Sequence, residues 1–113
     1  MMEEPRVKAE IWVRMALRLG AAANRYGVVV QRGDPDAGGV LVILRGPQGF
    51  AVLGQVRDAE GRACWLRGTG AEPVEEAQAL EYVARQTRRD PDLWVLEFES
   101  PDLLPPFEAR ILA

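Results

Sequence analysis

The apolar run Val-Leu-Val-Ile-Leu at residues 40–44 limits the possible folds more than any other segment of this 113-residue sequence. Most of its residues are β-branched, and no polar residue interrupts it. β-branched residues favour strands, and a strand with no polar position is typical of one that is covered on both faces. The run is also far shorter than the roughly 20 residues of a membrane-spanning helix. We therefore expect a buried strand of a folded domain here.

Two amphipathic helices and four further strands are predicted around this run. The first helix begins near Ala9 and ends before Gly27, and the second begins at Pro73, because proline suits the first helical position, and ends before Pro91. The face of the first helix that we expect to be buried carries Trp12, Met15, Ala16, Leu19, Gly20 and Ala23 at helical spacing. Ala9 extends this face by one turn, and Val13 and Leu17 widen it. The further strands are residues 28–32, 50–57, 62–69 and 93–99.

This order of elements, α-β-β-β-β-α-β, predicts an α+β protein. Short connections between the first four strands favour an antiparallel meander. We expect one antiparallel sheet of about five strands with both helices on one face, and the pattern leaves the position of the fifth strand open. Residues 1–113 are expected to form a single domain, with an irregular proline-rich tail from about residue 100.

The composition excludes several kinds of site. The chain has no histidine and one cysteine, so it cannot by itself form a Ser-His-Asp or Cys-His catalytic arrangement, a usual zinc site or an internal disulfide. We expect no cofactor. Residues 1–8 are charged and lack the apolar core of a signal peptide, so we expect a cytoplasmic protein.

Five motifs, which occur in a fixed order, give the sequence a family resemblance. They are residues 8–13 (KAEIWV), 32–38 (RGDPDAG), 55–62 (QVRDAEGR), 65–70 (WLRGTG) and 90–95 (DPDLWV). Together they resemble the bacterial family known as domain of unknown function 1491, over about residues 8–99. The resemblance implies a single bacterial cytoplasmic domain and carries no activity, ligand or partner with it.

A loop at residues 33–39 is the first candidate site. Gly33 and Gly38 would let backbone N–H groups approach an anion, and Asp34 and Asp36 would suit a hard cation such as Mg²⁺. The same residues are also the usual material of a turn between strands, and we favour that interpretation. A second Asp-Pro-Asp triplet follows at residues 90–92, and nothing in the sequence brings the two triplets together.

Arginines on the two predicted helices form the second candidate site, a basic surface. Its residues are Arg14, Arg18 and Arg25 in and after the first helix, and Arg85, Arg88 and Arg89 in the second. If the helices lie side by side, the two groups merge into a surface for nucleic acid or an acidic partner. The net charge of −3 favours a plain solvated face instead.

The function is not determined by these features, and three hypotheses remain. We favour a non-enzymatic interaction or accessory protein, because a small sheet has open edges that accept a strand from a protein partner or a second copy. A nucleic-acid-associated protein that uses the arginines is the second hypothesis. The third is a metal-dependent enzyme built on Asp34 and Asp36, whose stability would rise with Mg²⁺ or Mn²⁺.

Overall fold

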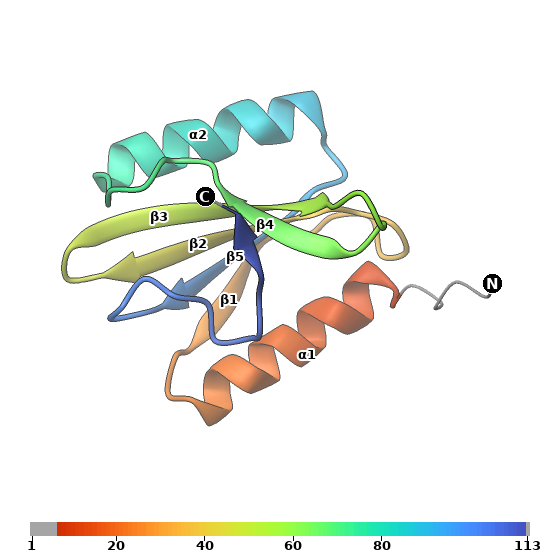
Figure 1. Cartoon of the computed structure of the whole chain (residues 1–113), viewed down its shortest axis with the longest axis horizontal. Helices are drawn as coiled ribbons and strands as arrows, with labels where there is room; N and C mark the ends of the chain where they lie inside the picture. Colours follow the sequence, from red (N-terminus) through yellow and green to blue (C-terminus); the bar gives the residue numbers. More distant parts are fainter. Residues whose placement is uncertain (1–6, 113) are drawn as a thin grey trace.

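A six-stranded mixed sheet lies between two helices (Figure 1). The computed structural model describes residues 7–112. The expectation of no signal peptide rests on residues 1–8, most of which lie outside the described residues. The elements are α1 (Ala9–Ala22), β1 (Gly27–Gln31), β2 (Val40–Gly46), β3 (Gly49–Arg57), β4 (Ala63–Arg67), α2 (Glu76–Arg89), β5 (Trp94–Glu99) and β6 (Ile111–Leu112). Among these residues, α1 and α2 both fall short of the length and apolarity required to cross a bilayer.

The strand order is β1-β5-β2-β3-β4-β6, which corrects the predicted antiparallel sheet. Strands β2, β3 and β4 do form the expected antiparallel meander. β5, however, lies between β1 and β2, antiparallel to the first and parallel to the second. The parallel pairing arises because α2 carries the chain back across the sheet, as parallel neighbours require. β6 adds a second parallel pair, with β4.

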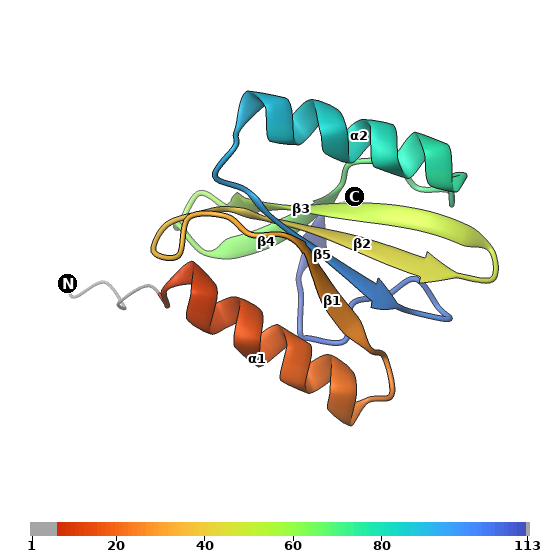
Figure 2. The same cartoon turned by 180° about the vertical axis from the view of Figure 1, so that it is seen from behind.

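The helices cover opposite faces of the sheet, so the prediction of both on one face is wrong (Figures 1 and 2). Val42 and Leu44 of β2 pack in a cluster with residues of α1, whereas Leu41 and Ile43 pack in a second cluster with α2. Successive side chains of a strand point to opposite faces. The apolar run at residues 40–44 therefore supplies both cores, which explains why it has no polar position.

α1 approaches the sheet closely through small side chains. Ala9, Val13, Ala16 and Gly20 form its buried face. A β-carbon at Gly20 would lie 2.7 Å from the ring of Phe98, so a larger residue would push the helix away. Met15 and Leu19, predicted to be buried, are instead 47% and 42% exposed.

α2 begins three residues later than predicted because Val74 belongs to the sheet. Its N–H and C=O groups both pair with Phe50 at 2.8 Å, which keeps the backbone extended. The helix then begins after Glu75, where Glu75 and Gln78 form a capping box. Tyr82 of α2 packs against Gly68, which has no side chain. A β-carbon at Gly68 would lie 2.1 Å from the Tyr82 hydroxyl oxygen, so the ring occupies the space that a larger residue would need.

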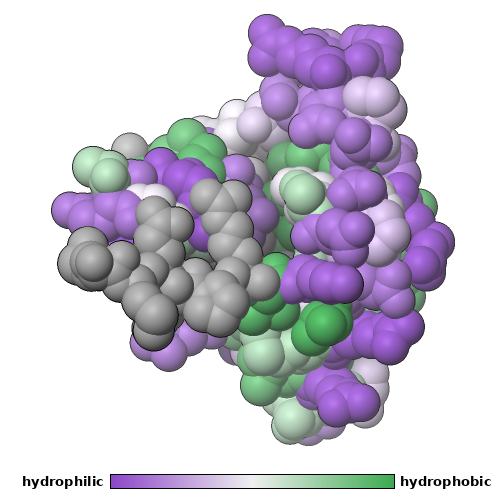
Figure 3. All heavy atoms as spheres, turned by 90° about the vertical axis from the view of Figure 1, so that its right-hand side faces the viewer, coloured by the Kyte–Doolittle hydropathy of each residue, from purple (hydrophilic) through white to green (hydrophobic). Residues whose placement is uncertain are grey.

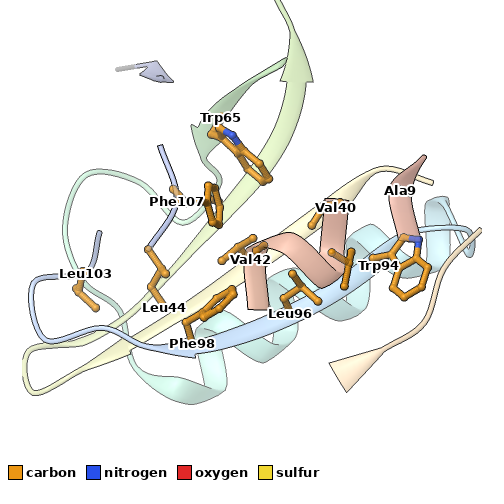
Figure 4. Close-up of a cluster of buried hydrophobic side chains, with 13 residues drawn as sticks. Ala9, Val40, Val42, Leu44, Trp65, Trp94, Leu96, Phe98, Leu103 and Phe107 are labelled. Atoms are coloured by element: carbon orange, nitrogen blue, oxygen red, sulfur yellow. The ribbon is translucent and has the colours of Figure 1, made fainter. Parts of the chain in front are cut away.

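The tail after residue 100 follows an irregular path as far as β6, and it belongs to the core (Figure 4). Phe107 is 8% exposed, and its ring centroid lies 5.0 Å from that of Trp12 and 5.3 Å from that of Trp65. Leu103 is also buried. The tail therefore closes the cluster between α1 and the sheet.

Replacing Phe107 should reveal this contribution. We expect Phe107→Ala to lower the free energy of unfolding by about 3–4 kcal/mol, because it removes a buried aromatic ring and leaves a cavity. Leu104→Ala, at a site that is 46% exposed, should change it by less than about 0.5 kcal/mol. Urea titrations followed by tryptophan fluorescence measure both. Equal effects of the two variants would show that the tail is not part of the core.

Candidate functional site

The loop at residues 33–39 contacts the second Asp-Pro-Asp triplet, which the sequence did not predict. The Asp34 N–H donates to the Asp92 carbonyl at 2.9 Å, and the Trp94 indole N–H donates to the Asp34 carbonyl at 2.8 Å. The Trp94 backbone N–H donates to Gly39 O at 2.9 Å. We call this contact between residues 33–39 and 90–94 the loop junction. It fixes the start of β5 against the connection between β1 and β2.

The glycines of the loop allow this close approach. A β-carbon at Gly33 would lie 2.2 Å from Asp92 O and 2.7 Å from the Trp94 ring, and one at Gly38 would lie 2.5 Å from Asp92 O. Neither distance leaves room for a side chain without a backbone shift. The second loop thus fills the space in which a side chain at Gly33 or Gly38 would lie.

The same loop also caps α1. Lys8, at the N-cap, provides no side-chain acceptor for the helix, and the first N–H groups find backbone carbonyls instead. Ala9 N–H donates to Asp36 O at 3.2 Å, and Glu10 N–H donates to Pro35 O at 3.0 Å. Since uncapped N–H groups at a helix start need partners, the loop fixes the position of α1 as well as that of β5.

Three of the four carboxylates of the loop junction, those of Asp34, Asp36 and Asp90, make contacts with nearby groups. Asp34 accepts the Ala37 N–H at 2.8 Å, and Asp90 accepts the Asp92 N–H at 3.1 Å. The Asp36 carboxylate lies 3.6 Å from the Lys8 ammonium. Within residues 7–112, no three acidic or thiol side chains converge as metal ligands. The contacts of Asp34 and Asp90 are local hydrogen bonds typical of turns.

The predicted basic surface is divided by the sheet. Arg14 and Arg18 lie on α1, whereas Arg85, Arg88 and Arg89 lie on α2, on the opposite face, so the two groups do not merge. Arg14 pairs with Glu10 at 2.7 Å, and Arg85 pairs with Glu81 at 3.0 Å. The arginines of α2, with Gln86, line an open surface hollow of about 490 Å³.

Arg25 has a structural role. Its guanidinium donates to Ser100 Oγ at 3.1 Å, to Leu104 O at 3.2 Å and to both carboxylate oxygens of Asp102. The hydrogen bond from Arg25 holds the pKa of Asp102 well below its usual range, against the opposing effect of partial burial. The pair ties the end of α1 to the start of the tail.

The outer edge of β1 is an exposed apolar feature that the sequence analysis did not locate, although it expected an open sheet edge. Tyr26, Val28 and Val30 are 61%, 59% and 53% exposed, and they alternate with partly buried residues. The Tyr26 carbonyl accepts the Glu99 N–H at 3.0 Å, so the backbone N–H and C=O groups of Tyr26 and Val28 face β5. Those of Gly27 and Val29 face outward, where the described chain provides no neighbouring strand. The valine run at residues 28–30 indicates a strand in the sequence. Whether that strand lies at an edge depends on the strand order, which the run does not determine.

A second exposed apolar feature runs along α1. Val7, Ile11, Met15 and Leu19, each four residues from the next, are 57%, 56%, 47% and 42% exposed. Figure 3 shows hydrophobic residues gathered between hydrophilic regions on one side of the molecule. We call these four residues the α1 stripe. The same segment carries Lys8 at the N-cap and Arg18 on the helix.

A family model described as a protein of unknown function (DUF1491) matches residues 7–108. The chain belongs to the DUF1491 family. The fold agrees with solved members: a crystal structure of a DUF1491 protein from Caulobacter crescentus CB15 has 25% identity and a TM-score of 0.83, and covers 95% of this chain and 100% of that one. An NMR structure of a DUF1491 protein from the same organism has 23% identity and a TM-score of 0.84, with coverages of 97% and 100%.

Protein Atu0922 from A. tumefaciens also has a similar structure, with 21% identity, a TM-score of 0.80, and coverages of 96% and 98%. No curated protein matches the chain. The DUF1491 relationship confirms the family resemblance read from the sequence motifs, and the function of the family is unknown.

Asp102→Asn should remove a pH-dependent part of the stability. Because the pKa of Asp102 is lower in the folded chain than the ordinary value near 3.9, its ionised form stabilises the fold above that pH, and the gain disappears as pH falls through the folded pKa. We expect a loss of about 1 kcal/mol at pH 7, allowing for screening of a carboxylate that is 47% exposed.

Urea titrations of both proteins between pH 7 and pH 2 measure this difference. It should shrink below about pH 4, towards zero at the acid end. Glu108→Gln, at an exposed position of the same tail, is the matched control and should show no such trend. A difference that stays constant with pH would contradict the assigned role of the carboxylate.

Proposed function

We propose that this chain is a non-enzymatic interaction protein that binds an extended polypeptide strand along the outer edge of β1. The observation that carries the proposal is the combination of outward-facing backbone groups at Gly27 and Val29 with exposed apolar side chains at Tyr26, Val28 and Val30. Backbone groups of a sheet edge provide affinity for an added strand, and alternating side chains provide selectivity. The side chains at this edge are apolar, so the strand it selects is apolar as well.

The two edges of the sheet differ in their capacity to bind a strand. The far edge is β6, which pairs with β4 and has only two residues, so it presents few backbone groups to an added strand. Exposed edges of stable proteins are usually blunted by charges, proline or bulges. β1 has one such feature, a bulge between Val29 and Gln31, but no charged residue or proline within its five residues. Residues 26–29 therefore remain available for pairing.

We place this activity in the bacterial cytoplasm. The one thiol of the chain, Cys64, is fully buried, so it needs no oxidising compartment and offers no disulfide to a partner. The bacterial origin of the solved DUF1491 proteins supports the bacterial setting.

Anion binding on α2 is a second candidate function. The observation that favours it is the hollow lined by Arg85, Arg88 and Arg89 at the C-terminal end of the helix. A nucleic acid bound there would dissociate steeply with rising salt, because each phosphate contact releases counterions. The hollow lies on one helix only, so we rank this function below strand binding.

A photo-crosslinking amino acid placed at position 26 tests the proposed function. Tyr26 and Leu80 are exposed to 61% and 48%, so the same probe at position 80 on α2 is the matched control. Expressed in a bacterium that contains a DUF1491 protein, the probe at position 26 should give a discrete adduct, identified by mass spectrometry. Adding Val28→Lys to the same chain should abolish the adduct. No adduct at position 26, or equal adducts at both positions, would rule out strand binding at β1.

A further inference from the structure

We infer that the strand bound by β1 is β1 of a second copy of this chain, antiparallel and centred on a two-fold axis at Val28. This inference rests on the proposed function and names its partner. It follows from two properties of the edge, the direction of its backbone groups and the identity of its exposed side chains.

The backbone groups of the edge are complementary to themselves. Gly27 and Val29 point their N–H and C=O groups outward. When a second copy runs antiparallel with Val28 opposite Val28, Gly27 faces Val29 of the second copy, and Val29 faces Gly27. Each such pair exchanges two hydrogen bonds. The register lies before the bulge between Val29 and Gln31, so no irregular residue enters the hydrogen-bonded part.

The side chains match in the same register. Val28 meets Val28 across the axis, and Tyr26 of each copy lies opposite Val30 of the other, the bulge residue at which the regular register ends. These pairs are apolar or aromatic, the combinations that stabilise antiparallel neighbours. All three side chains are more than half exposed in the single chain, so their burial would be new. No like charges face each other among residues 26–30.

The α1 stripe is less suited to self-association. If two α1 helices packed antiparallel with Ile11 opposite Met15, then Lys8 of each copy would face Arg18 of the other. Like charges in such positions repel. The edge of β1 has no equivalent conflict, which is why we assign the contact between copies to β1.

We expect a weak dimer. A stable interface buries about 800 Å² per partner, and two five-residue edge strands cover less than that. The two-fold axis of such a pairing is perpendicular to the sheet. Both sheets would thus join into one, with the two α1 helices on one face and the two α2 helices on the other.

Oxidative crosslinking of single-cysteine additions tests the register. In a non-hydrogen-bonded antiparallel pair the opposed Cα atoms lie about 4.5 Å apart, within the range of a disulfide. Val28→Cys should therefore form a covalent dimer under mild oxidation. Val30→Cys is the matched control, because the two introduced cysteines of the dimer would lie about 14 Å apart along the strands. Cys64 is fully buried and does not compete. Equal rates for both variants would indicate random collision and would overturn the inference.

Sedimentation equilibrium tests the same contact without a crosslink. The unmodified chain should show a concentration-dependent monomer–dimer equilibrium, which Val28→Lys should weaken at least about tenfold by opposing two charges at the axis. Ile11→Lys, at an equally exposed position on α1, should leave it unchanged. A chain that stays monomeric to about 1 mM, or a dimer lost with Ile11→Lys instead, would refute a dimer at β1.

The two proposals can fail separately. A monomeric chain whose position-26 probe crosslinks to a different protein would refute the second copy as the partner and leave strand binding intact. A monomeric chain with no adduct at position 26 would refute both.

Discussion

The parallel pairing of β5 with β2 at the centre of the sheet determines the rest of the architecture. It extends from Val40 opposite Trp94 to Arg45 opposite Glu99. Because β5 occupies the place beside β2 that β1 would take in a meander, β1 becomes the outer strand. Both central strands are buried on both faces, so each face needs a cover, and α1 and α2 provide one each.

The loop junction holds this arrangement in place and accounts for the most distinctive sequence motif. The loop at residues 33–39 must cross the start of β5 to connect β1 to β2, and it does so through backbone hydrogen bonds to Asp92 and Trp94. Its carbonyls also cap α1. The motif is therefore explained by folding. The same arrangement leaves the outer edge of β1 exposed, and this edge is where we propose that a partner binds.

Much of the secondary structure could be predicted from local patterns, but the sheet order could not. The apolar run at residues 40–44 correctly indicated a strand buried on both faces, which already conflicts with two helices on one face. Pairing of β5 with β2 joins residues about 54 positions apart, and hydrophobic periodicity contains no information on such contacts. Because the strand order was unknown, the sequence could predict that the sheet has an open edge but not that β1 forms it. The predicted apolar face of α1 included its four buried residues, but it also included Met15, Leu19 and Ala23, which are exposed. Helical periodicity does not determine which side of so wide an apolar face packs against the sheet.

The free energy of unfolding of Gly33→Ala tests the central role of the loop junction most directly. The added methyl group would lie 2.2 Å from Asp92 O, so we expect a loss of about 2 kcal/mol and faster hydrogen exchange in β5. Gly54→Ala is the matched control, because its nearest neighbour would lie at an ordinary 3.5 Å, and it should cost less than about 0.5 kcal/mol. If Gly33→Ala proves as stable as Gly54→Ala, with β5 equally protected, the loop junction does not hold the central pairing.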